Sequence, residues 1–206
     1  MTQQSPLVLV LDDDPAILIG LERLLTTHGY SVKLYADPEA FFSDGLPAEP
    51  ACLLLDNQLG NGTSGVEVHA EMRRRAWDIT TVFVTAHWDI QTVVQAMRAG
   101  ADDFLAKPYH PAKLLEVVEQ ALQRSLVMHR EGLQAAAARA KLATLTDRER
   151  EIVRWVVGGL LNKEIADQLN LAVITVKVHR GSAMRKLGAG NSAELAHIAT
   201  LSGLVR

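Results

Sequence analysis

The amino-acid sequence predicts two domains: an α/β domain with a doubly wound, five-stranded parallel sheet, and a small all-α domain behind it. Short apolar runs alternate with helical patterns through the first 124 residues, whereas residues 144–206 hold helical patterns alone. Charge divides in the same region, because residues 1–124 carry 9 Lys and Arg against 17 Asp and Glu, and residues 125–206 carry 12 against 7. An acidic front and a basic rear indicate two units with different partners, the rear one suited to nucleic acid.

Five short runs, mostly apolar, predict strands of which most are buried on both faces. They are Leu7–Leu11, Ser31–Tyr35, Ala51–Leu55, Thr81–Thr85 and Asp103–Ala106. Helical patterns between and after them cover Pro15–His28, Pro38–Asp44, Gly65–Arg75, Ile90–Ala99 and Pro111–Arg124. Strictly alternating strands and helices predict a parallel sheet with right-handed crossovers and helices on both faces.

Turn and cap residues support these boundaries. Gly29 and Gly100 fall where helices should stop, and Ser64-Gly-Val-Glu67 is a capping box that opens the third helix. Residues 125–143 carry no strand signal and favour a helical linker interrupted at Gly132, with a plain extension of the preceding helix as an equal alternative. We therefore expect domains over residues 5–124 and 144–206, joined by a helical linker over 125–143.

The C-terminal region predicts four short helices. Thr146-Asp-Arg-Glu149 is a second capping box, and Asn162 and Asn191 are expected to cap later helices. The expected helices run from that box through Val157, then over Lys163–Leu169, Val173–Leu187 and Ser192–Thr200. Four short helices are enough for a compact helical domain.

The chain carries no signal for export or for membrane insertion. No apolar stretch approaches the roughly 18 residues that a membrane span needs, and Met1–Pro6 lacks the basic start of a secretory signal. Cys52 is the single cysteine, so no internal disulfide can form, and its apolar neighbours indicate a buried small side chain. We expect a cytoplasmic protein with no membrane partner.

Polar side chains follow four of the five predicted strands. Asp12-Asp13-Asp14 ends the first, Asp56 ends the third, Thr85 ends the fourth and Lys107 follows the fifth. Open α/β sheets bind ligands at the carboxyl ends of their strands, and a flavodoxin-like strand order brings these four ends together. Aspartates also cap helices and begin turns, but their ordered recurrence at successive strand ends favours a binding site.

These residue types suit phosphoryl transfer. Clustered carboxylates repel one another unless a cation compensates, and Mg2+ is the hard divalent ion that suits two carboxylates with carbonyl and water oxygens. A carboxylate can act as the nucleophile, while an ammonium and a hydroxyl group bind and neutralise phosphoryl oxygens. The sequence therefore predicts a Mg2+-dependent phosphoryl-acceptor site.

The pattern Asp-Asp, Asp, Thr-Ala and Lys-Pro resembles the receiver domain of two-component response regulators over residues 5–124. The resemblance implies that Asp56 is the phosphoacceptor for a sensor histidine kinase, beside the acid pair Asp12 and Asp13. It also implies that Asp13, Asp56 and the backbone carbonyl of Gln58 hold Mg2+, that Thr85 and Lys107 bind phosphoryl oxygens, and that Phe104 is a switching aromatic.

The segment after Asp56 departs from the usual receiver pattern. Leu59-Gly60-Asn61-Gly62-Thr63-Ser64-Gly65 lacks the expected proline and is one residue longer. Its extra glycines predict a more mobile loop, which bears on phosphoryl lifetime and metal affinity rather than on the identity of the acceptor. Trp88 stands where a small residue is common, either exposed on a dimerisation surface or packed.

Residues 174–187 form a basic amphipathic pattern without a single acidic residue. Val176, Ala183 and Leu187 fall on one side of a helical wheel, and Lys177, Val178, Gly181 and Arg185 fall on the other. A short helix and a tight turn precede this pattern, which is the plan of a helix-turn-helix. A solvated surface helix is the competing interpretation.

The same region resembles the LuxR-type DNA-binding domain of the NarL/FixJ family of response regulators. The matching motifs are Leu-Thr-x-Arg-Glu at 145–149, Asn-Lys-Glu-Ile-Ala at 162–166, Thr-Val-Lys-x-His at 175–179 and Lys-Leu-Gly at 186–188. The resemblance implies that Lys177 and Val178 approach base edges, that Asn162, Lys163 and Thr175 lie near phosphates, and that Arg180 and Arg185 support them. It also implies dimerisation through the last helix. Ala172 stands where a serine cap is common, which should cost the helix about 1 kcal/mol.

Together these features predict a transcription regulator in which phosphorylation of Asp56 promotes homodimerisation and binding to double-stranded DNA, with RNA polymerase as a further candidate partner. The receiver would catalyse its own phosphotransfer and dephosphorylation and would not otherwise be an enzyme. The alternative is a regulator whose receiver is a phosphorylation-independent dimerisation module. A Mg2+-dependent phosphatase with Asp56 as nucleophile is the enzyme alternative, and it leaves the helix-turn-helix without a role.

Overall fold

The computed structural model describes residues 5–86, 100 and 102–205. The chain divides into two compact units, Met1–His129 and Arg130–Arg206. The predicted helix Ile90–Ala99 and Trp88 lie outside the described residues. None of the helices described is long and apolar enough to cross a membrane.

The first unit is built on a five-stranded parallel sheet. Its strands are β1 (Leu7–Leu11), β2 (Ser31–Tyr35), β3 (Ala51–Asp56), β4 (Thr80–Thr85) and β5 (Asp103–Ala106). Their order is β2-β1-β3-β4-β5, and every neighbouring pair is parallel. This is the doubly wound order expected from the sequence, so the fold prediction is confirmed.

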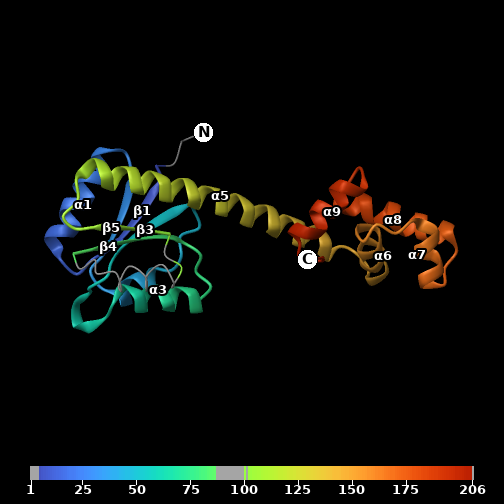
Figure 1. The fold of residues 1–206 in the computed structure, drawn as a ribbon, viewed down its shortest axis with the longest axis horizontal. Helices are drawn as coiled ribbons and strands as arrows, with labels where there is room; N and C mark the ends of the chain where they lie inside the picture. The colour runs from blue at the N-terminus through green and yellow to red at the C-terminus, as the bar shows by residue number, and fades with distance from the viewer. Residues whose placement is uncertain (1–4, 87–99, 101, 206) are drawn as a thin grey trace. The chain divides into compact units, whose positions relative to one another are not determined.

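Helices cover both faces of this sheet (Figure 1). One face packs against α1 (Pro15–Thr27) and α5 (Pro111–Ala143), and the other packs against α2 (Pro38–Asp44) and α3 (Gly65–Arg74). Alternate residues of β1 and β3 point to the two cores, as the twofold period of a strand requires. The three inner strands, β1, β3 and β4, are therefore buried along their whole length.

Two details of this unit bear on the sequence predictions. Cys52 lies inside the sheet, where burial raises the pKa of its thiol to about 12, and this agrees with the small buried side chain that was expected. Strand β2 lies at the edge of the sheet and is partly exposed at Ser31 and Lys33. It is less buried than the inner strands, and it has a neighbouring strand on one side only.

Helix α5 continues without a break through Gly132 to Ala143. The interruption expected at Gly132 is therefore wrong, and the alternative of an extended fifth helix describes the structure. A glycine in a helix costs roughly 1 kcal/mol relative to alanine, and the alanine-rich segment that follows it offsets this cost.

The second unit holds the end of α5 and four shorter helices. They are α6 (Asp147–Val157), α7 (Asn162–Leu169), α8 (Val173–Leu187) and α9 (Ser192–Leu201). Thr146 opens α6 through a complete capping box, as predicted, and Asn191 caps α9. Their apolar faces enclose a core that includes Ile152, Ile165, Val176, Leu187 and Leu195.

Candidate functional site

Three carboxylates converge where β1 and β3 end. Asp12 and Asp13 follow β1, and Asp56 is the last residue of β3, whose preceding residue Leu55 is paired in register with Leu11. One ligand oxygen of each aspartate lies within 4.8 Å of those of the other two. Asp12 is 3% exposed and Asp56 is 8% exposed, while Asp13 faces solvent. The parallel register therefore produces the acidic cluster that the strand ends predicted.

Lys107 links two of these carboxylates. Its Nζ donates to Asp12 Oδ2 at 2.7 Å and to Asp56 Oδ1 at 3.3 Å. The backbone N–H of Lys107 donates to the carbonyl of Thr85 at 2.7 Å, which holds the ends of β4 and β5 together. Thr85 is buried and lies one residue beyond Val84, the register partner of Asp56. The four predicted pocket side chains thus lie at one edge of the sheet.

Burial and charge act on Asp56 and Lys107 in opposite directions. Burial raises the pKa of Asp56, the Lys107 ammonium lowers it, and the neighbouring Asp12 carboxylate raises it, so the pKa stays above its ordinary value. Burial alone lowers the pKa of Lys107, but its bonds and charges with Asp12 and Asp56 outweigh this effect and raise it. Lys107 is therefore kept protonated, whereas ionisation of the neighbouring Asp56 carboxyl group is disfavoured.

The third aspartate of the run has a different role. The side chain of Asp14 accepts from the backbone N–H of Ala16 at 2.8 Å and caps α1, whose first residue is Pro15. The N–H of Asp14 in turn donates to Asp12 Oδ1 at 3.0 Å. Helix capping thus explains one aspartate of the three, and the backbone N–H of Asp14 binds one oxygen of Asp12 while Lys107 binds the other.

The donor set of this cluster fits a Mg2+ ion. Carboxylate oxygens are the hard ligands that Mg2+ prefers, and a site with few protein ligands is usual for this ion. The cluster holds three carboxylates against one ammonium, so an added divalent cation would reduce their repulsion. A backbone hydrogen bond from Gln58 to Asp56 places that residue at the same edge.

The glycine-rich loop after β3 folds into a short closed turn. Gly60–Gly62 form a 3-10 helix, the N–H of Leu59 donates to the carbonyl of Thr63 at 3.1 Å, and Gln58 pairs with Ser64 in an antiparallel bridge. A Cβ on Gly60 would come within 3.3 Å of Asp13 Oδ2. The loop thus lies directly beside the acidic cluster, and its first glycine permits that approach.

Two aromatic residues lie on or near this edge. Phe104, the predicted switching aromatic, lies on β5 and is 38% exposed. Tyr109 was not predicted, yet burial raises its pKa, the Lys107 charge lowers it, and the charges of Asp12 and Asp56 raise it, which places Tyr109 near the cluster. Its position two residues after Lys107 was the only sequence signal for it.

The second unit presents the predicted DNA-facing residues mainly on α8. Lys177, Val178 and Arg185 are exposed on this helix, Lys163 is exposed on α7, and Thr175 is half-buried. Ala172 is the N-cap of α8 and provides no side-chain bond, as the sequence predicted. The structure therefore keeps a basic outer face on α8 while Val176, Ala183 and Leu187 enter the core.

Arg180 and Asn162 are engaged within the domain. Arg180 donates to Asn162 Oδ1 at 2.9 Å and to Ser192 Oγ at 2.8 Å, which ties α8 to the starts of α7 and α9. The prediction that Asn162 caps α7 is wrong: Leu161 is the N-cap, and its backbone N–H is bound by Glu164. Asn162 is instead the first residue of α7, and its side chain accepts from Arg180.

Glu149 is buried, and its carboxylate accepts several hydrogen bonds, only some of which the sequence predicted. Besides the backbone N–H of Thr146 in the capping box, its carboxylate accepts from Lys186 Nζ at 2.7 Å and from Ser182 Oγ at 2.6 Å. Lys186 and then Ser182 lower the pKa of Glu149 to about 2. The capping-box motif predicted the bond from Thr146, whereas no residue spacing in the sequence predicted the bonds from Ser182 and Lys186 of α8.

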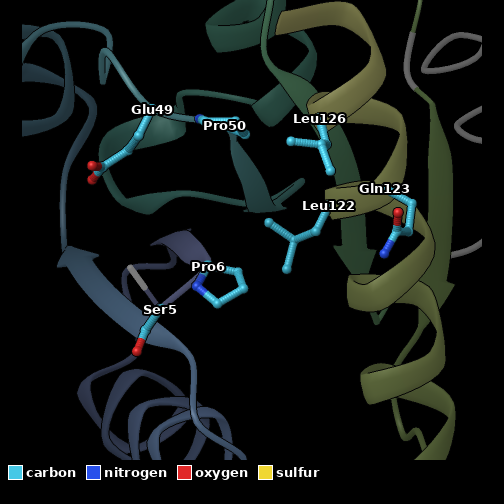
Figure 2. Close-up of a pocket in the computed structure, with 7 residues that line it drawn as sticks. All are labelled: Ser5, Pro6, Glu49, Pro50, Leu122, Gln123 and Leu126. Carbon is cyan, nitrogen blue, oxygen red and sulfur yellow. The ribbon is translucent and has the colours of Figure 1, made fainter. Parts of the chain in front are cut away.

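A separate hollow lies at the opposite edge of the sheet. It has a volume of about 340 Å³ and is bounded by residues that precede β1 and β3 and by α5. Figure 2 shows the apolar side chains of Pro6, Pro50, Leu122 and Leu126 around it, with the carboxylate of Glu49 directed away. None of the predicted site residues lines this hollow, so it is not a second candidate for the phosphoryl chemistry.

Comparisons with protein families match both halves of the chain. Residues 8–119 match the response regulator receiver domain, and residues 143–199 match the bacterial regulatory proteins of the luxR family. Together the two matches place the acidic cluster in the first family and helices α6–α9 in the second.

Individual relatives match nearly the whole length. The chain is 34% identical to the transcriptional regulatory protein FixJ of Azorhizobium caulinodans, over 95% of this chain and 92% of FixJ. It is 33% identical to nodulation protein W of Bradyrhizobium diazoefficiens, over 96% and 87%. Among solved structures, the response regulator StyR has a TM-score of 0.80 at 36% identity, over 95% of this chain and 98% of StyR. Full-length FixJ from B. japonicum has a TM-score of 0.58 at 30% identity, over 99% and 100%.

Proposed function

Because the chain belongs to the response regulators that join a receiver domain to a luxR-type DNA-binding domain, we propose that phosphorylation of Asp56 controls how it binds DNA. It is a transcriptional response regulator, like the FixJ proteins that it matches over almost the whole chain. We assign the receiver to residues 5–124, a helical linker to 125–143 and the DNA-binding domain to 144–206, in keeping with the family matches at 8–119 and 143–199.

The observation that carries the proposal is the position of Lys107 between Asp12 and Asp56. In the proposed reaction, a carboxylate oxygen of Asp56 attacks the phosphorus of a phosphohistidine on the partner kinase. An O–P bond forms, the P–N bond breaks and the histidine ring is released. The Lys107 ammonium and the Thr85 hydroxyl would then bind oxygens of the new acyl phosphate. Hydrolysis of that acyl phosphate by the receiver itself would reset the site.

Asp13, Asp56 and the backbone carbonyl of Gln58 would hold a Mg2+ ion in this pocket. When bound, the ion supplies positive charge to the transferring phosphoryl oxygens. The chain's own residues would position and shield the reacting groups. Asp12 orients Lys107 through the 2.7 Å hydrogen bond, and burial of Asp56 limits its contact with water.

The output would reach DNA through α8. Phosphorylation adds negative charge at Asp56, which draws Thr85 and Lys107 toward the phosphoryl group, and Phe104 would turn inward from its present half-exposed position. The altered receiver surface would form a homodimer, which presents two α8 helices to two DNA half-sites. Lys177 and Val178 would approach bases, while Lys163, Thr175 and Arg185 would lie near phosphates.

Binding to chromosomal DNA and to a kinase would place the protein in the cytoplasm, with RNA polymerase as a further candidate partner.

Phosphorylation can be tested on the full chain with acetyl phosphate and Mg2+ as reagents. We expect intact-mass spectrometry to show one added phosphoryl group on the wild type and none on Asp56→Asn. The matched control is Asp78→Asn, because Asp78 is an exposed receiver aspartate far from the cluster in sequence. Modification of Asp56→Asn to the same extent as the wild type would overturn the assignment of the acceptor.

Dimerisation is tested by sedimentation with and without beryllofluoride, which mimics the phosphoryl group. We expect the wild type to shift from monomer to dimer and Asp56→Asn to stay monomeric. A wild type that is dimeric and binds DNA equally without the analogue would favour a receiver that acts as a phosphorylation-independent dimerisation module.

A further inference from the structure

The outer face of α8 is more apolar in its first half than a phosphate-binding surface requires. Its exposed positions are Ile174, Lys177, Val178, Gly181 and Arg185, which recur every three or four residues and so share one face of the helix. The opposite face enters the core of the domain. Whatever approaches α8 from outside therefore meets this set of side chains.

Ile174 and Val178 dominate the first half of that face. Ile174 is 67% exposed and Val178 is 63% exposed, and neither belongs to the apolar core of the helical unit. They are four residues apart, so their branched side chains lie next to each other on the helix surface. Neither side chain can donate or accept a hydrogen bond, so their contribution to binding would come from burial of apolar surface.

Gly181 lies about one turn further along the same face of α8. It lies seven residues after Ile174 on the same face, and a Cβ built there would meet no atom within 4 Å. Packing within the domain therefore does not require glycine at this position, although glycine weakens a helix interior. The missing side chain leaves room for an outside surface to approach the helix backbone closely.

Other basic residues near this face are already occupied. Arg180 is bound to Asn162 and Ser192, and Lys186 is bound to Glu149. Lys177 and Arg185 are exposed on the same face of α8, Lys177 beside Val178 and Arg185 one turn after Gly181. The face thus combines an apolar pair in its first half with one cation beside that pair and another further along the helix.

We propose that Ile174 and Val178 read the C5-methyl groups of thymines in the major groove. This inference rests on the proposed role of α8 as the DNA-reading helix. Thymine is the base that presents a methyl group in that groove, whereas the other bases present hydrogen-bond donors and acceptors there. The N-terminal residues of a recognition helix are those that reach base edges. The favoured half-site accordingly carries thymines opposite the first two turns of α8.

The test replaces thymine by uracil, which pairs identically but lacks the methyl group. The full chain with beryllofluoride selects bound duplexes from a pool of double-stranded DNA with a random central segment. The preferred duplex is then made twice, with deoxythymidine or with deoxyuridine throughout. We expect wild-type affinity to fall roughly fourfold for each methyl contact that is lost, the factor that corresponds to one buried methylene-sized group.

Substitutions locate the methyl contacts on the protein. Ile174→Ala and Val178→Ala should each bind the thymine duplex more weakly than the wild type and lose less than the wild type when uracil replaces thymine. Such non-additivity is the signature of a direct contact. Leu133→Ala is the matched control, because Leu133 is an exposed apolar residue outside α8. This variant should respond to uracil as the wild type does.

The outcomes separate this inference from the proposed function. Equal wild-type affinity for the two duplexes, with a specific site still selected, would overturn methyl recognition and leave DNA binding by α8 intact. Equal uracil sensitivity in the wild type and in both alanine variants would also overturn it, because the methyl groups would then act elsewhere. Failure to select or bind any duplex would overturn the proposed DNA-binding function itself. Circular dichroism should show that both variants remain folded, because the two side chains are exposed.

Discussion

Lys186 near the end of α8 donates to Glu149 near the start of α6 at a distance of 2.7 Å. The carboxylate of Glu149 is buried, and it also binds Ser182 and the backbone of Thr146. One side chain therefore caps α6 and is bound to α8, the helix that we propose faces DNA. Glu149 is the buried member of this pair and Lys186 is partly exposed, so the cost of losing the carboxylate lies in the hydrogen bonds that it accepts.

Glu149→Gln should destabilise the helical unit by on the order of 2 kcal/mol, because a neutral amide with one acceptor oxygen cannot replace the carboxylate that accepts from Thr146, Ser182 and Lys186. Urea unfolding followed by amide exchange in α6 and α8 would measure the change. Glu151→Gln is the matched control, since Glu151 pairs with Arg148 on the surface and should cost less than about 0.5 kcal/mol. Equal effects of the two substitutions would show that burial of Glu149 adds nothing.

The same carboxylate sets a pH dependence. Its folded pKa of about 2 lies below the ordinary value of 4.5, so ionised Glu149 stabilises the folded state. This stabilisation is fully present above pH 4.5 and is lost as the pH falls through about 2. The free energy of unfolding of α6 and α8 should therefore decrease less steeply between these limits in Glu149→Gln than in the wild type. Parallel pH profiles for the two proteins would contradict the assignment.

Asp56→Asn should make the receiver more stable in the presence of a chelator, by on the order of 1 kcal/mol. The pKa of Asp56 is raised, so its stabilising contribution is present below its unfolded pKa and is lost as the pH rises through the folded value. At neutral pH the ionised form is costly, and asparagine removes that cost. Thermal unfolding with chelator, and again with Mg2+, checks the prediction.

Added Mg2+ should then raise the melting temperature of the wild type more than that of Asp56→Asn, because the metal binds the folded carboxylate cluster. Asp78→Asn should behave like the wild type in both conditions. A lower melting temperature for Asp56→Asn in chelator would contradict the view that the cluster is electrostatically unfavourable.

Gly65→Ala should destabilise the receiver by more than about 2 kcal/mol. A Cβ at Gly65 would lie 2.4 Å from the backbone oxygen of Asp56, so the loop or the end of β3 must move. Gly132→Ala is the contrasting change: no atom lies within 4 Å of a Cβ there, and helical alanine should stabilise α5 by up to about 1 kcal/mol. Urea unfolding of both variants would reveal whether the signs are opposite, as expected.

Ala172→Ser should stabilise the helical unit by about 1 kcal/mol, because a serine at the N-cap can accept from a free N–H of the first helical turn. Ala172 has the extended backbone of an N-cap and provides no such bond. Ala172→Val carries no hydroxyl and is the matched control. Thermal unfolding should separate the two variants, and equal melting temperatures would show that the cap position tolerates no serine bond.

Local patterns predicted the elements well where a strand or cap is marked by neighbouring residues. The five strands, the capping boxes at Ser64 and Thr146 and the convergence of Asp12, Asp56 and Lys107 follow from periodicity and parallel topology. The interruption at Gly132 was wrong because the alanine-rich residues after it favour a helix more strongly than one glycine opposes it.

What sequence could not predict depends on contacts between elements. Asn162 was expected to cap α7, but Arg180, eighteen residues later, binds its side chain. Glu149 was recognised as part of a capping box, while its bonds to Ser182 and Lys186 required the packing of α6 against α8. Such partners have no fixed spacing, so only the folded arrangement reveals them.

The bonds of Arg180 to Asn162 and Ser192 have a consequence for the DNA rather than for the protein. They join α8 to its two neighbouring helices, so we expect that a DNA-reading surface on α8 would not tilt by itself to fit a groove of a different width. A duplex whose groove departs from that surface must bend or twist to fit, and the elastic cost depends on its base steps. Base pairs that α8 never touches would then still influence which promoters the protein selects.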